Sequence, residues 1–378
     1  MKIFAVLAGL LLIVMVLWET FETIVLPRRV TRQFRLTRLF YRSTWRPWAA
    51  LAAVRSTKKK RDAMLSYYGP LSLLLLLAFW AVTLVFGFAL LHYGFHDRLS
   101  GKLFPNDFGN ALYLSGTTLF TLGLGDIVPA TGMGRFVTVL EGGMGFGFLA
   151  LVIGYLPVLY QAFSRREVTI SLLDARAGSP PTAAELLRRQ SGPHGIESLT
   201  ELLEHWELWA ADLMESHLSY PVLAYFRSQH DNQSWIASLT AVLDLCALTM
   251  VGMEGMCQYQ ARMTFAIARH ALVDLSQVFS APPEKDRGRD RLPPEVLAEL
   301  RAALTASGFV LAAGEAAIAE LTRLRGLYEP FAFALADHLR LELPPWIKTA
   351  KAKDNWQTTA WQNKAQPTVA VSTLDEHL

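Results

Sequence analysis

Residues 118–126 have the sequence Thr-Leu-Phe-Thr-Leu-Gly-Leu-Gly-Asp, and this stretch decides the fold. Its two glycines stand at alternate positions, and glycine adopts positive φ angles without a steric penalty. Alternating conformations of this kind point successive backbone carbonyls to the same side. A short apolar segment, 111–117, precedes the stretch, and a long apolar segment follows Pro129. The sequence therefore predicts a carbonyl-lined loop held between membrane-embedded helices.

Residues 111–145 resemble the pore of tetrameric potassium channels of the two-span, pore-loop type, with an extra N-terminal span. The residues that occupy the family's motif positions are Thr118, Thr121, Gly123, Gly125, Asp126 and Pro129. In that family a ring of backbone carbonyls, one strand per subunit, replaces the hydration shell of a potassium ion. The resemblance implies a potassium-selective channel that conducts K+ passively. The expected filter residues are Thr121, Leu122, Gly123, Leu124 and Gly125, with K+ held at the first four.

Two filter positions depart from the family pattern. Leu122 stands where the family usually has Val or Ile, and Leu124 where it usually has Tyr or Phe. Both positions contribute backbone carbonyls, so the coordinating atoms are kept. Leu124 removes an aromatic hydroxyl that can brace the filter, which leaves a weakly selective cation channel as one alternative. A non-conducting membrane scaffold or sensor, with the loop as a glycine-rich turn, is the other.

Three apolar stretches are long enough to span a bilayer, which takes about 20 residues. They cover residues 3–25, 71–93 and 136–160 of the 378-residue chain. The two cysteines both lie in the C-terminal half, so no disulfide framework is expected. The predicted fold class is an all-α membrane protein, a potassium-channel-like pore with a re-entrant pore helix, joined to an all-α cytosolic C-terminal domain.

Charge placement predicts the orientation. Residues 28–61 contain twelve Lys and Arg residues and no acid, and loops this basic stay in the cytoplasm. The N-terminus is then outside, the filter faces outward, and the C-terminus is cytoplasmic, in a multi-pass protein of the cell (inner) membrane. A rival interpretation takes residues 1–16 as a signal peptide, whose removal would reverse this orientation. The sequence alone does not say whether residues 1–26 are retained.

The segment 27–65 is basic and amphipathic, with aromatic residues at roughly helical spacing. Such a segment lies among lipid headgroups, and Arg28–Arg61 is expected to contact anionic lipid. Two interpretations stay open: a lipid-sensing or gate-coupling helix, or a loop that only sets topology. Nucleic acid is not an expected partner beside a membrane span.

The pore domain is predicted over residues 66–163. Its parts are an outer helix 70–94, a pore helix 106–118, a filter 121–126 and an inner helix 134–161. The pore helix is roughly 18 Å long, too short to span, so it must re-enter among other helices. The first span, 1–26, is expected at the periphery.

Three residues are expected to support the filter: Thr118, Asp126 and Glu141. The resemblance implies that Asp126 braces the filter from behind, although its usual acidic partner on the pore helix is replaced by Thr117. An acid inside a span usually marks function. Glu141 either attracts cations in the cavity or hydrogen-bonds the pore helix near Ser115 or Thr117, and the second interpretation is favoured.

The inner helix carries the expected gate. The resemblance places the gating hinge at Gly145, and close helix packing is the alternative role for this glycine. Phe146, Leu149 and Ile153 are expected to narrow the cavity, and Pro157 to bend the helix near its cytoplasmic end. Because each chain has one pore loop, four chains are needed, which predicts a homotetramer.

The C-terminal half predicts a helical cytosolic domain, 164–350, followed by a disordered tail, 351–378. The predicted helices cover residues 183–190, 196–217, 221–229, 233–279, 294–324 and 329–341. The apolar run 235–253 imitates a fourth span, but Asp244 in its middle favours a core helix. No nucleotide-binding motif, cofactor site or catalytic constellation is visible, and the His/Glu neighbours at 201–207 are a weak metal signal. Neither a ligand of this domain nor a gating stimulus is predicted.

Overall fold

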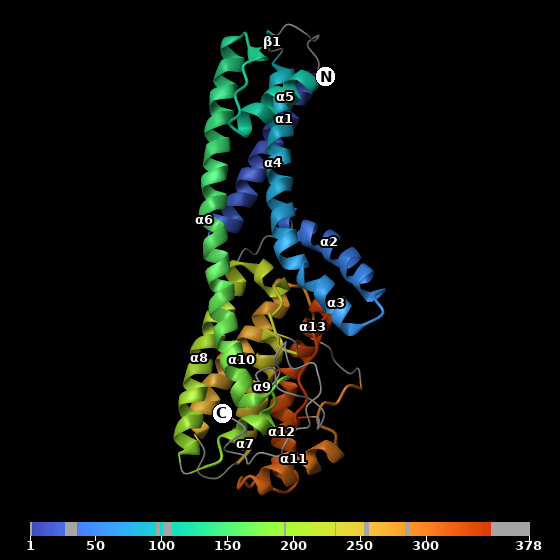
Figure 1. The fold of residues 1–378 in the computed structure, drawn as a ribbon, viewed down its shortest axis with the longest axis vertical. Helices are drawn as coiled ribbons and strands as arrows, with labels where there is room; N and C mark the ends of the chain where they lie inside the picture. Colours follow the sequence, from blue (N-terminus) through green and yellow to red (C-terminus); the bar gives the residue numbers. More distant parts are fainter. Residues whose placement is uncertain are drawn as a thin grey trace, which may run out of the picture. The chain divides into compact units, whose positions relative to one another are not determined.

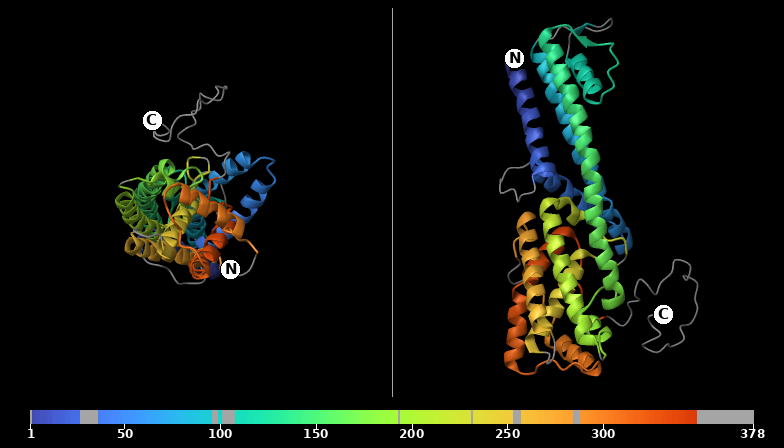
Figure 2. Two further views of the ribbon diagram at one scale, coloured as in Figure 1. Left: turned by 90° about the horizontal axis from the view of Figure 1, so that it is seen from below. Right: turned by 90° about the vertical axis from the view of Figure 1, so that its left-hand side faces the viewer.

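The computed structural model describes residues 2–26, 36–95, 99–100, 108–192, 194–230, 232–252, 257–283 and 288–348. The predicted tail, 351–378, and residues 27–35 of the basic segment lie outside these ranges. The chain divides into two compact units, Met1–Gln161 and Ala162–Leu378. The described regular structure is almost entirely helical, which confirms the predicted fold class (Figures 1 and 2).

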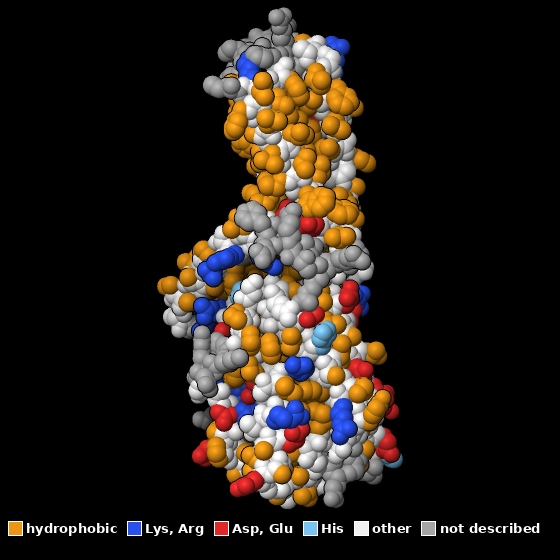
Figure 3. Space-filling model, turned by 180° about the vertical axis from the view of Figure 1, so that it is seen from behind, with side chains coloured by type: hydrophobic (Ala, Val, Ile, Leu, Met, Phe, Trp, Pro, Cys, Tyr) orange, Lys and Arg blue, Asp and Glu red, His pale blue; other side chains and the backbone are white. Residues whose placement is uncertain are grey.

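Unit 1 contains the membrane helices. They are α1 (Lys2–Thr20, continued by the short π-helix η1, Phe21–Val25), α4 (Tyr68–Gly94), α5 (Phe108–Leu119) and the first part of α6 (Gly132–Ala177). All except α5 are long and apolar enough to cross a membrane. Hydrophobic side chains cover the exposed face of these helices in Figure 3. This protein is therefore a membrane protein.

Glycines allow α1 to lie directly against α4. A Cβ atom at Gly9 would lie 2.5 Å from the carbonyl oxygen of Gly87, and one at Gly94 would lie 2.5 Å from Val6 Cγ2. Any larger side chain at these positions forces the two helices apart. Since lipid tails are as apolar as leucine, close packing of this kind is a main source of helix association in a bilayer. The first span is thus fixed to the outer helix.

A buried carboxylate ends the first span and begins the next helix. Glu19, which is fully buried, accepts hydrogen bonds from the backbone N–H groups of Leu36 (3.0 Å) and Thr37 (3.2 Å) and from the Thr37 hydroxyl (2.8 Å). These N–H groups begin α2 (Leu36–Ala53) and have no partner within the helix. A negative charge there also complements the helix dipole. Glu19 therefore joins α1 to α2.

The far end of α2 is fixed by aromatic residues. The ring centroids of Trp45 and Tyr68 lie 4.8 Å apart, and the hydroxyl oxygens of Thr44 and Tyr68 are 2.8 Å apart. Trp48 Nε1 donates to the carbonyl of Met64 in α3 (Lys58–Ser66) at 3.1 Å. These contacts hold α2 and α3 beside the first turn of α4.

The inner helix is longer than predicted. α6 continues through Pro157 to Ala177, whereas the sequence pattern placed its end at residue 161. Beyond that point the helix buries a stripe at helical spacing, which is what keeps it helical. The stripe consists of Phe163, Arg166, Ile170, Leu173 and Ala177. The boundary between the two units consequently falls inside one continuous helix.

Unit 2 is a helical domain built around α9. After the last part of α6 its elements are α7 (Ala183–Arg189), α8 (Gly195–Ser219), the 3-10 helix η2 (Pro221–Tyr225), α9 (Trp235–Gly252), α10 (Gln258–Val278), α11 (Pro294–Ala306), α12 (Glu315–Gly326) and α13 (Glu329–Leu339). Every residue from Trp235 to Thr249 is buried. By length and composition alone α9 could cross a membrane, but a helix enclosed by protein has no face for lipid. This burial supports the core-helix interpretation.

Two helices predicted as continuous are divided. The range 233–279 forms α9 and α10, and the range 294–324 forms α11 and α12. Glycines end the first helix of each pair: Gly252 has φ 123° and Gly308 has φ 84°. Positive φ angles are incompatible with a right-handed helix and are open to glycine. The apolar periodicity on either side concealed these breaks.

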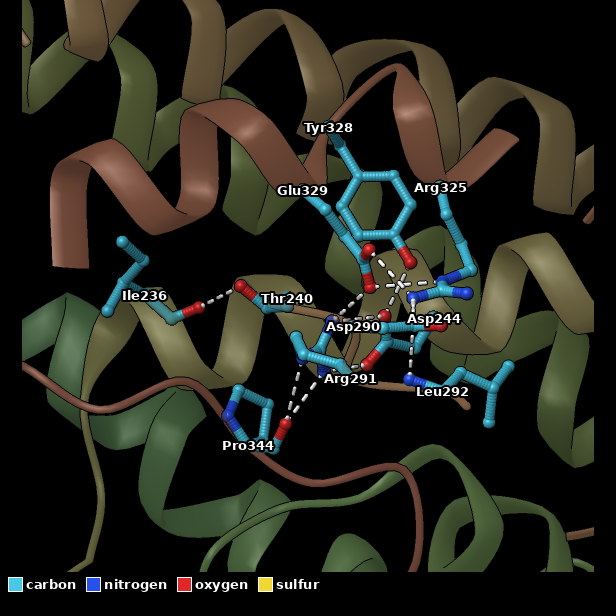
Figure 4. Close-up of polar contacts among 10 residues, drawn as sticks. All are labelled: Ile236, Thr240, Asp244, Asp290, Arg291, Leu292, Arg325, Tyr328, Glu329 and Pro344. Carbon is cyan, nitrogen blue, oxygen red and sulfur yellow. Dashed lines mark hydrogen bonds and ion pairs between the residues drawn. The ribbon is translucent and has the colours of Figure 1, made fainter. Parts of the chain in front are cut away.

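A buried ionic network surrounds Asp244 of α9 (Figure 4). Arg291 donates to both Asp244 oxygens (3.0 and 2.5 Å), to Glu329 (3.0 Å) and to the carbonyl of Pro344 (2.7 Å). The Tyr328 hydroxyl donates to Asp244 at 2.5 Å. Burial, together with the nearby carboxylates, raises the pKa of Tyr328 well above its usual value, so the phenol keeps its proton. Asp244 is thus a fully paired core residue that ties α9 to the C-terminal elements.

A second buried cation lies at the start of unit 2. Arg166 of α6 donates to Nε2 of His217 (3.1 Å) and to the carbonyls of Leu223 (2.9 Å) and Phe226 (2.7 Å). His217 Nδ1 lies 2.9 Å from the Leu213 carbonyl, which only accepts, so Nδ1 carries the proton and Nε2 accepts from Arg166. Only the neutral imidazole makes both bonds.

This arrangement makes unit 2 sensitive to acid. Burial and the Arg166 charge lower the pKa of His217 well below its usual value. The pKa of His217 in the folded protein lies below its value in the unfolded chain, about 6.5. The contribution of His217 to the free energy of unfolding is therefore complete above that pH. It falls as the pH drops through that value, by up to about 1.4 kcal/mol per pH unit. Thermal unfolding of the full chain in detergent should show this loss, and His217→Gln should reduce the pH dependence.

The matched control is His194→Gln, because the His194 side chain is 90% exposed. It should keep the wild-type pH dependence. An equal pH dependence in wild type and His217→Gln would contradict the assignment.

Candidate ion-conducting site

The pore helix is α5, twelve residues long and therefore about 18 Å. Its first described residue is Phe108, and the predicted start at residue 106 lies outside the described ranges. Beyond the filter, Val128 and Pro129 form strand β2, which pairs antiparallel with β1 (Leu99–Ser100). This short sheet fixes the loop after the filter to the segment that follows α4.

The C-terminal end of α5 holds the start of the candidate filter, residues 121–126. The carbonyl of Thr117 accepts hydrogen bonds from the backbone N–H groups of Leu122 (2.8 Å) and Gly123 (3.1 Å), and the carbonyl of Thr118 accepts from Thr121 (3.0 Å). Positive φ angles occur at Thr121 (57°), Gly123 (54°) and Gly125 (77°). The filter backbone therefore alternates in conformation at each second residue, as the glycine spacing predicts.

The carbonyls of residues 121–125 accept no hydrogen bond from the described residues. Within the described part of the chain, no N–H or O–H group donates to the carbonyl of any residue from Thr121 to Gly125. Residues 121–125 are exposed in the single chain, so their carbonyl oxygens are open to solvent or to an ion. A row of unpartnered carbonyl oxygens on an alternating backbone is suited to coordinate a dehydrated cation.

Asp126 has a partner that the sequence did not indicate. The Tyr113 hydroxyl, on α5, donates to Asp126 Oδ2 at 2.9 Å. This bond joins the outer end of the filter to the pore helix. Asp126 therefore has a partner on the pore helix even though Thr117 replaces the expected acid. Tyr113 lies one helical turn before Thr117. This spacing is the sequence signal that identifies the phenol as a candidate partner of Asp126.

Glu141 of α6 contacts the pore helix. Its carboxylate forms a short hydrogen bond with the Ser115 hydroxyl, the residue named by the favoured interpretation. The other carboxylate oxygen lies 3.4 Å from Nε2 of His92 on α4. Sequence reasoning missed His92, although a histidine within the second apolar run was a visible signal. The supporting role of Glu141 in conduction stays a prediction.

Gly145 is in tight contact with the pore helix. A Cβ atom at this position would collide with the carbonyl group of Leu119, the last residue of α5. Glu141 and Ser115 lie one turn earlier on the same two helices. This geometry supports the packing role for Gly145 and leaves the hinge role as a prediction. Thr118 also faces α6, since a Cβ atom at Gly142 would lie 3.9 Å from its methyl group.

The remaining predicted gate residues share one face of α6. Phe146, Leu149, Ile153 and Pro157 are exposed and spaced by three or four residues. Phe146 is 69% exposed and Ile153 63% exposed. A large apolar face of this kind is available to line a cavity or to contact a neighbouring chain.

Metal-binding side chains do not gather elsewhere. In the ranges that the structure describes, no group of three or more His, Cys, Asp and Glu residues is placed to hold a metal ion. The candidate ligands are backbone oxygens and the Thr121 hydroxyl, which suit a hard monovalent cation.

Comparison with known proteins identifies the class of unit 1. Residues 75–161 match a family described as "Ion channel", which confirms the resemblance of this region to channel pores. Residues 75–161 of unit 1 are therefore similar to ion-channel pores, which supports ion-channel function.

A relative is the "Uncharacterized membrane protein YdjJ" of Bacillus subtilis (strain 168), 29% identical over 185 residues. The match covers 48% of this chain and 52% of the relative, so the chain spans about half the length of the curated relative it matches. No solved structure matches the chain.

Removing the Tyr113 hydroxyl tests the brace. Tyr113→Phe deletes the bond to Asp126 and should make the current decay several-fold faster during sustained conduction, because the outer filter loses its tie to α5. Tyr93→Phe is the matched control, since within the described residues the Tyr93 hydroxyl forms no hydrogen bond and only its ring packs, on Phe108. Decay kinetics in lipid bilayers measure both. Equal decay in Tyr113→Phe and wild type would contradict the brace.

Proposed function

We propose that this protein is a potassium-selective channel that conducts K+ passively through a homotetrameric pore. The observation that carries the proposal is the row of carbonyls from Thr121 to Gly125, on an alternating backbone, to which no described residue donates a hydrogen bond. Four such rows around an axis supply the oxygen cage that a dehydrated K+ requires. The function is transport rather than catalysis, with K+ as the permeant ion and no cofactor.

Exposed apolar side chains support assembly of several copies. Leu122 and Leu124, in the filter, are each 64% exposed in the single chain. Phe136 and Val139, on the first turns of α6, are 64% and 76% exposed. One filter strand cannot surround an ion, so neighbouring copies with cyclic symmetry complete the site.

The orientation follows from charge. The basic segment between α1 and α4 belongs in the cytoplasm. The N-terminus and the filter then lie outside, and unit 2 lies in the cytosol. The membrane is the cell (inner) membrane. Gly145, Phe146, Leu149, Ile153 and Pro157 are the proposed gating residues. A ligand of unit 2 would bias the gate only through different affinities for the open and closed states.

Current through purified protein tests the function. In a planar bilayer with K+ on one side and Na+ on the other, the reversal potential should lie close to the K+ equilibrium potential. A reversal potential near zero favours the weakly selective cation channel that Leu124 allows. Absence of current under all conditions favours the non-conducting scaffold or sensor.

A glycine substitution gives the matched comparison. Gly123→Ala puts a side chain on a residue with φ 54°, which strains the filter backbone, and should abolish K+ selectivity or current while the tetramer persists. Gly147→Ala adds a Cβ in open space on α6 and should conduct normally. Normal selectivity in Gly123→Ala would contradict the filter assignment.

We further propose that α2 and α3 bind anionic lipid headgroups. The start and the middle of α2 are tied to membrane helices, through Glu19 and Tyr68, so α2 lies at the membrane surface. Arg38, Arg42 and Arg46 are exposed at four-residue spacing, and among the described residues none has a carboxylate partner. Exposed apolar residues, Leu39 at 53% and Val54 at 81%, lie on the same helix and its end. Figure 3 shows cations beside hydrophobic side chains in this region.

Neutralising the three arginines should weaken this interaction by about 1 kcal/mol each. Rubidium flux is measured in phosphatidylcholine vesicles that contain increasing amounts of phosphatidylglycerol. The variant Arg38→Gln/Arg42→Gln/Arg46→Gln should need more of this anionic lipid than wild type to reach the same flux. Arg262→Gln/Arg323→Gln, which changes exposed cations of unit 2, is the control. An unchanged lipid dependence would leave the segment a topology signal only.

A further inference from the structure

His92, Ser115 and Glu141 form a buried polar cluster behind the filter, here called the His92 cluster. They come from the outer helix α4, the pore helix α5 and the inner helix α6, and each is at most 1% exposed. His92 Nε2 lies 3.4 Å from Glu141 Oε2, and the Ser115 hydroxyl forms a short hydrogen bond with Glu141 Oε1. The cluster is therefore the point at which all three helices of the pore domain meet through side-chain polar groups.

The proton count of Ser115 shows that the cluster has two states. The Ser115 hydroxyl also lies 2.8 Å from the carbonyl of Val85, on α4. A hydroxyl donates one proton, and a backbone carbonyl only accepts. When Ser115 donates to Val85, Glu141 must carry a proton and donate to Ser115. When Glu141 is ionised, Ser115 turns to donate to Glu141 and its bond to Val85 is lost.

These two states act at the base of the filter. Ser115 lies two residues before Thr117, whose carbonyl receives the N–H groups of Leu122 and Gly123. One turn further along, Gly145 leaves no space between α6 and the end of α5. A change in how Ser115 is held to α4 and α6 therefore reaches the carbonyl that anchors the filter through one turn of helix.

We propose that the His92 cluster positions the pore helix, and that the proton on Glu141 sets how long the filter stays conducting. This inference rests on the proposed channel function. His92 is a positioning residue whose Nε2 lies against the second carboxylate oxygen of Glu141. Other titratable side chains on the elements packed around it include Lys2 and Glu19 (α1), Tyr68 and Tyr93 (α4), Tyr113 (α5), Asp126 after the filter and Arg135, Tyr155 and Tyr160 (α6).

The test measures gating and selectivity separately. Glu141→Gln keeps the shape and donates permanently, as the protonated acid does. At neutral pH the current of this variant should decay at the rate that wild type shows in acid. The decay rate should change little between about pH 8 and pH 5. The reversal potential should equal that of wild type. His92→Gln keeps a hydrogen-bond donor near Glu141 Oε2 and should keep the wild-type pH response, because the proposal assigns the controlling proton to Glu141.

A double-mutant cycle tests the link to the pore helix. Ser115→Ala should change the decay rate about tenfold, the effect of one hydrogen bond to a charged group, and Glu141→Gln should add nothing further in that background. Ser72→Ala is the matched control, since Ser72 is buried on α4 and donates only to Gly69 of its own helix. Its effect should add to that of Glu141→Gln.

Three results overturn the inference. They are a wild-type pH response in Glu141→Gln, a shifted reversal potential with unchanged gating, and additive effects of Ser115→Ala and Glu141→Gln. If Ser115→Ala fails to form tetramers, the pH response of the isosteric Glu141→Gln decides alone. If wild type itself carries no current, the channel function fails and this inference fails with it, whereas a conducting wild type with unaltered variants overturns only the inference.

Discussion

The backbone of the candidate conducting site depends on the carbonyl of Thr117. This carbonyl accepts the N–H groups of Leu122 and Gly123, so two donors of the candidate filter are used on the pore helix. The carbonyl oxygens of residues 121–125 accept no hydrogen bond from any residue that the structure describes. A single carbonyl at the end of a short helix thus determines which atoms of the loop are available to an ion.

Close backbone contact maintains this geometry. Gly145 brings α6 against Leu119, and Gly9 and Gly87 bring α1 against α4. In a bilayer these contacts replace the hydrophobic drive that packs helices in water. Polar side chains add direction: Glu19 fixes where α2 begins, and the His92 cluster fixes how the pore helix meets its neighbours. The pore domain is therefore specified by small residues and a few buried acids.

The sequence predicted the class of fold and the filter backbone because both follow from local pattern. Apolar length gives the spans, and glycine at every second position gives the alternating φ angles. It did not predict His92 or Tyr113 as partners, because contacts between distant segments leave no periodic signal. The breaks at Gly252 and Gly308 were hidden for a different reason, since apolar residues continue at helical spacing on both sides. Asp244 was readable as a core residue, but its partner Arg291 was not.

The continuity of α6 has a mechanical consequence. Arg166, on the last part of the helix, is buried and bonded to His217, Leu223 and Phe226, so this end of α6 belongs to the core of unit 2. Glu141 and Gly145, on the first part, belong to the packing of the pore. Arg166 keeps its ion pair with Glu167 on the same helix (2.8 Å), but breaking its bonds to Leu223 and Phe226 is costly because it takes the donor from two carbonyl oxygens. A rearrangement of unit 2 that moves Arg166 must therefore either move the part of α6 that carries Glu141 or bend the helix between these two residues. Pro157 lies between them and removes one helical hydrogen bond, so the helix bends most easily there.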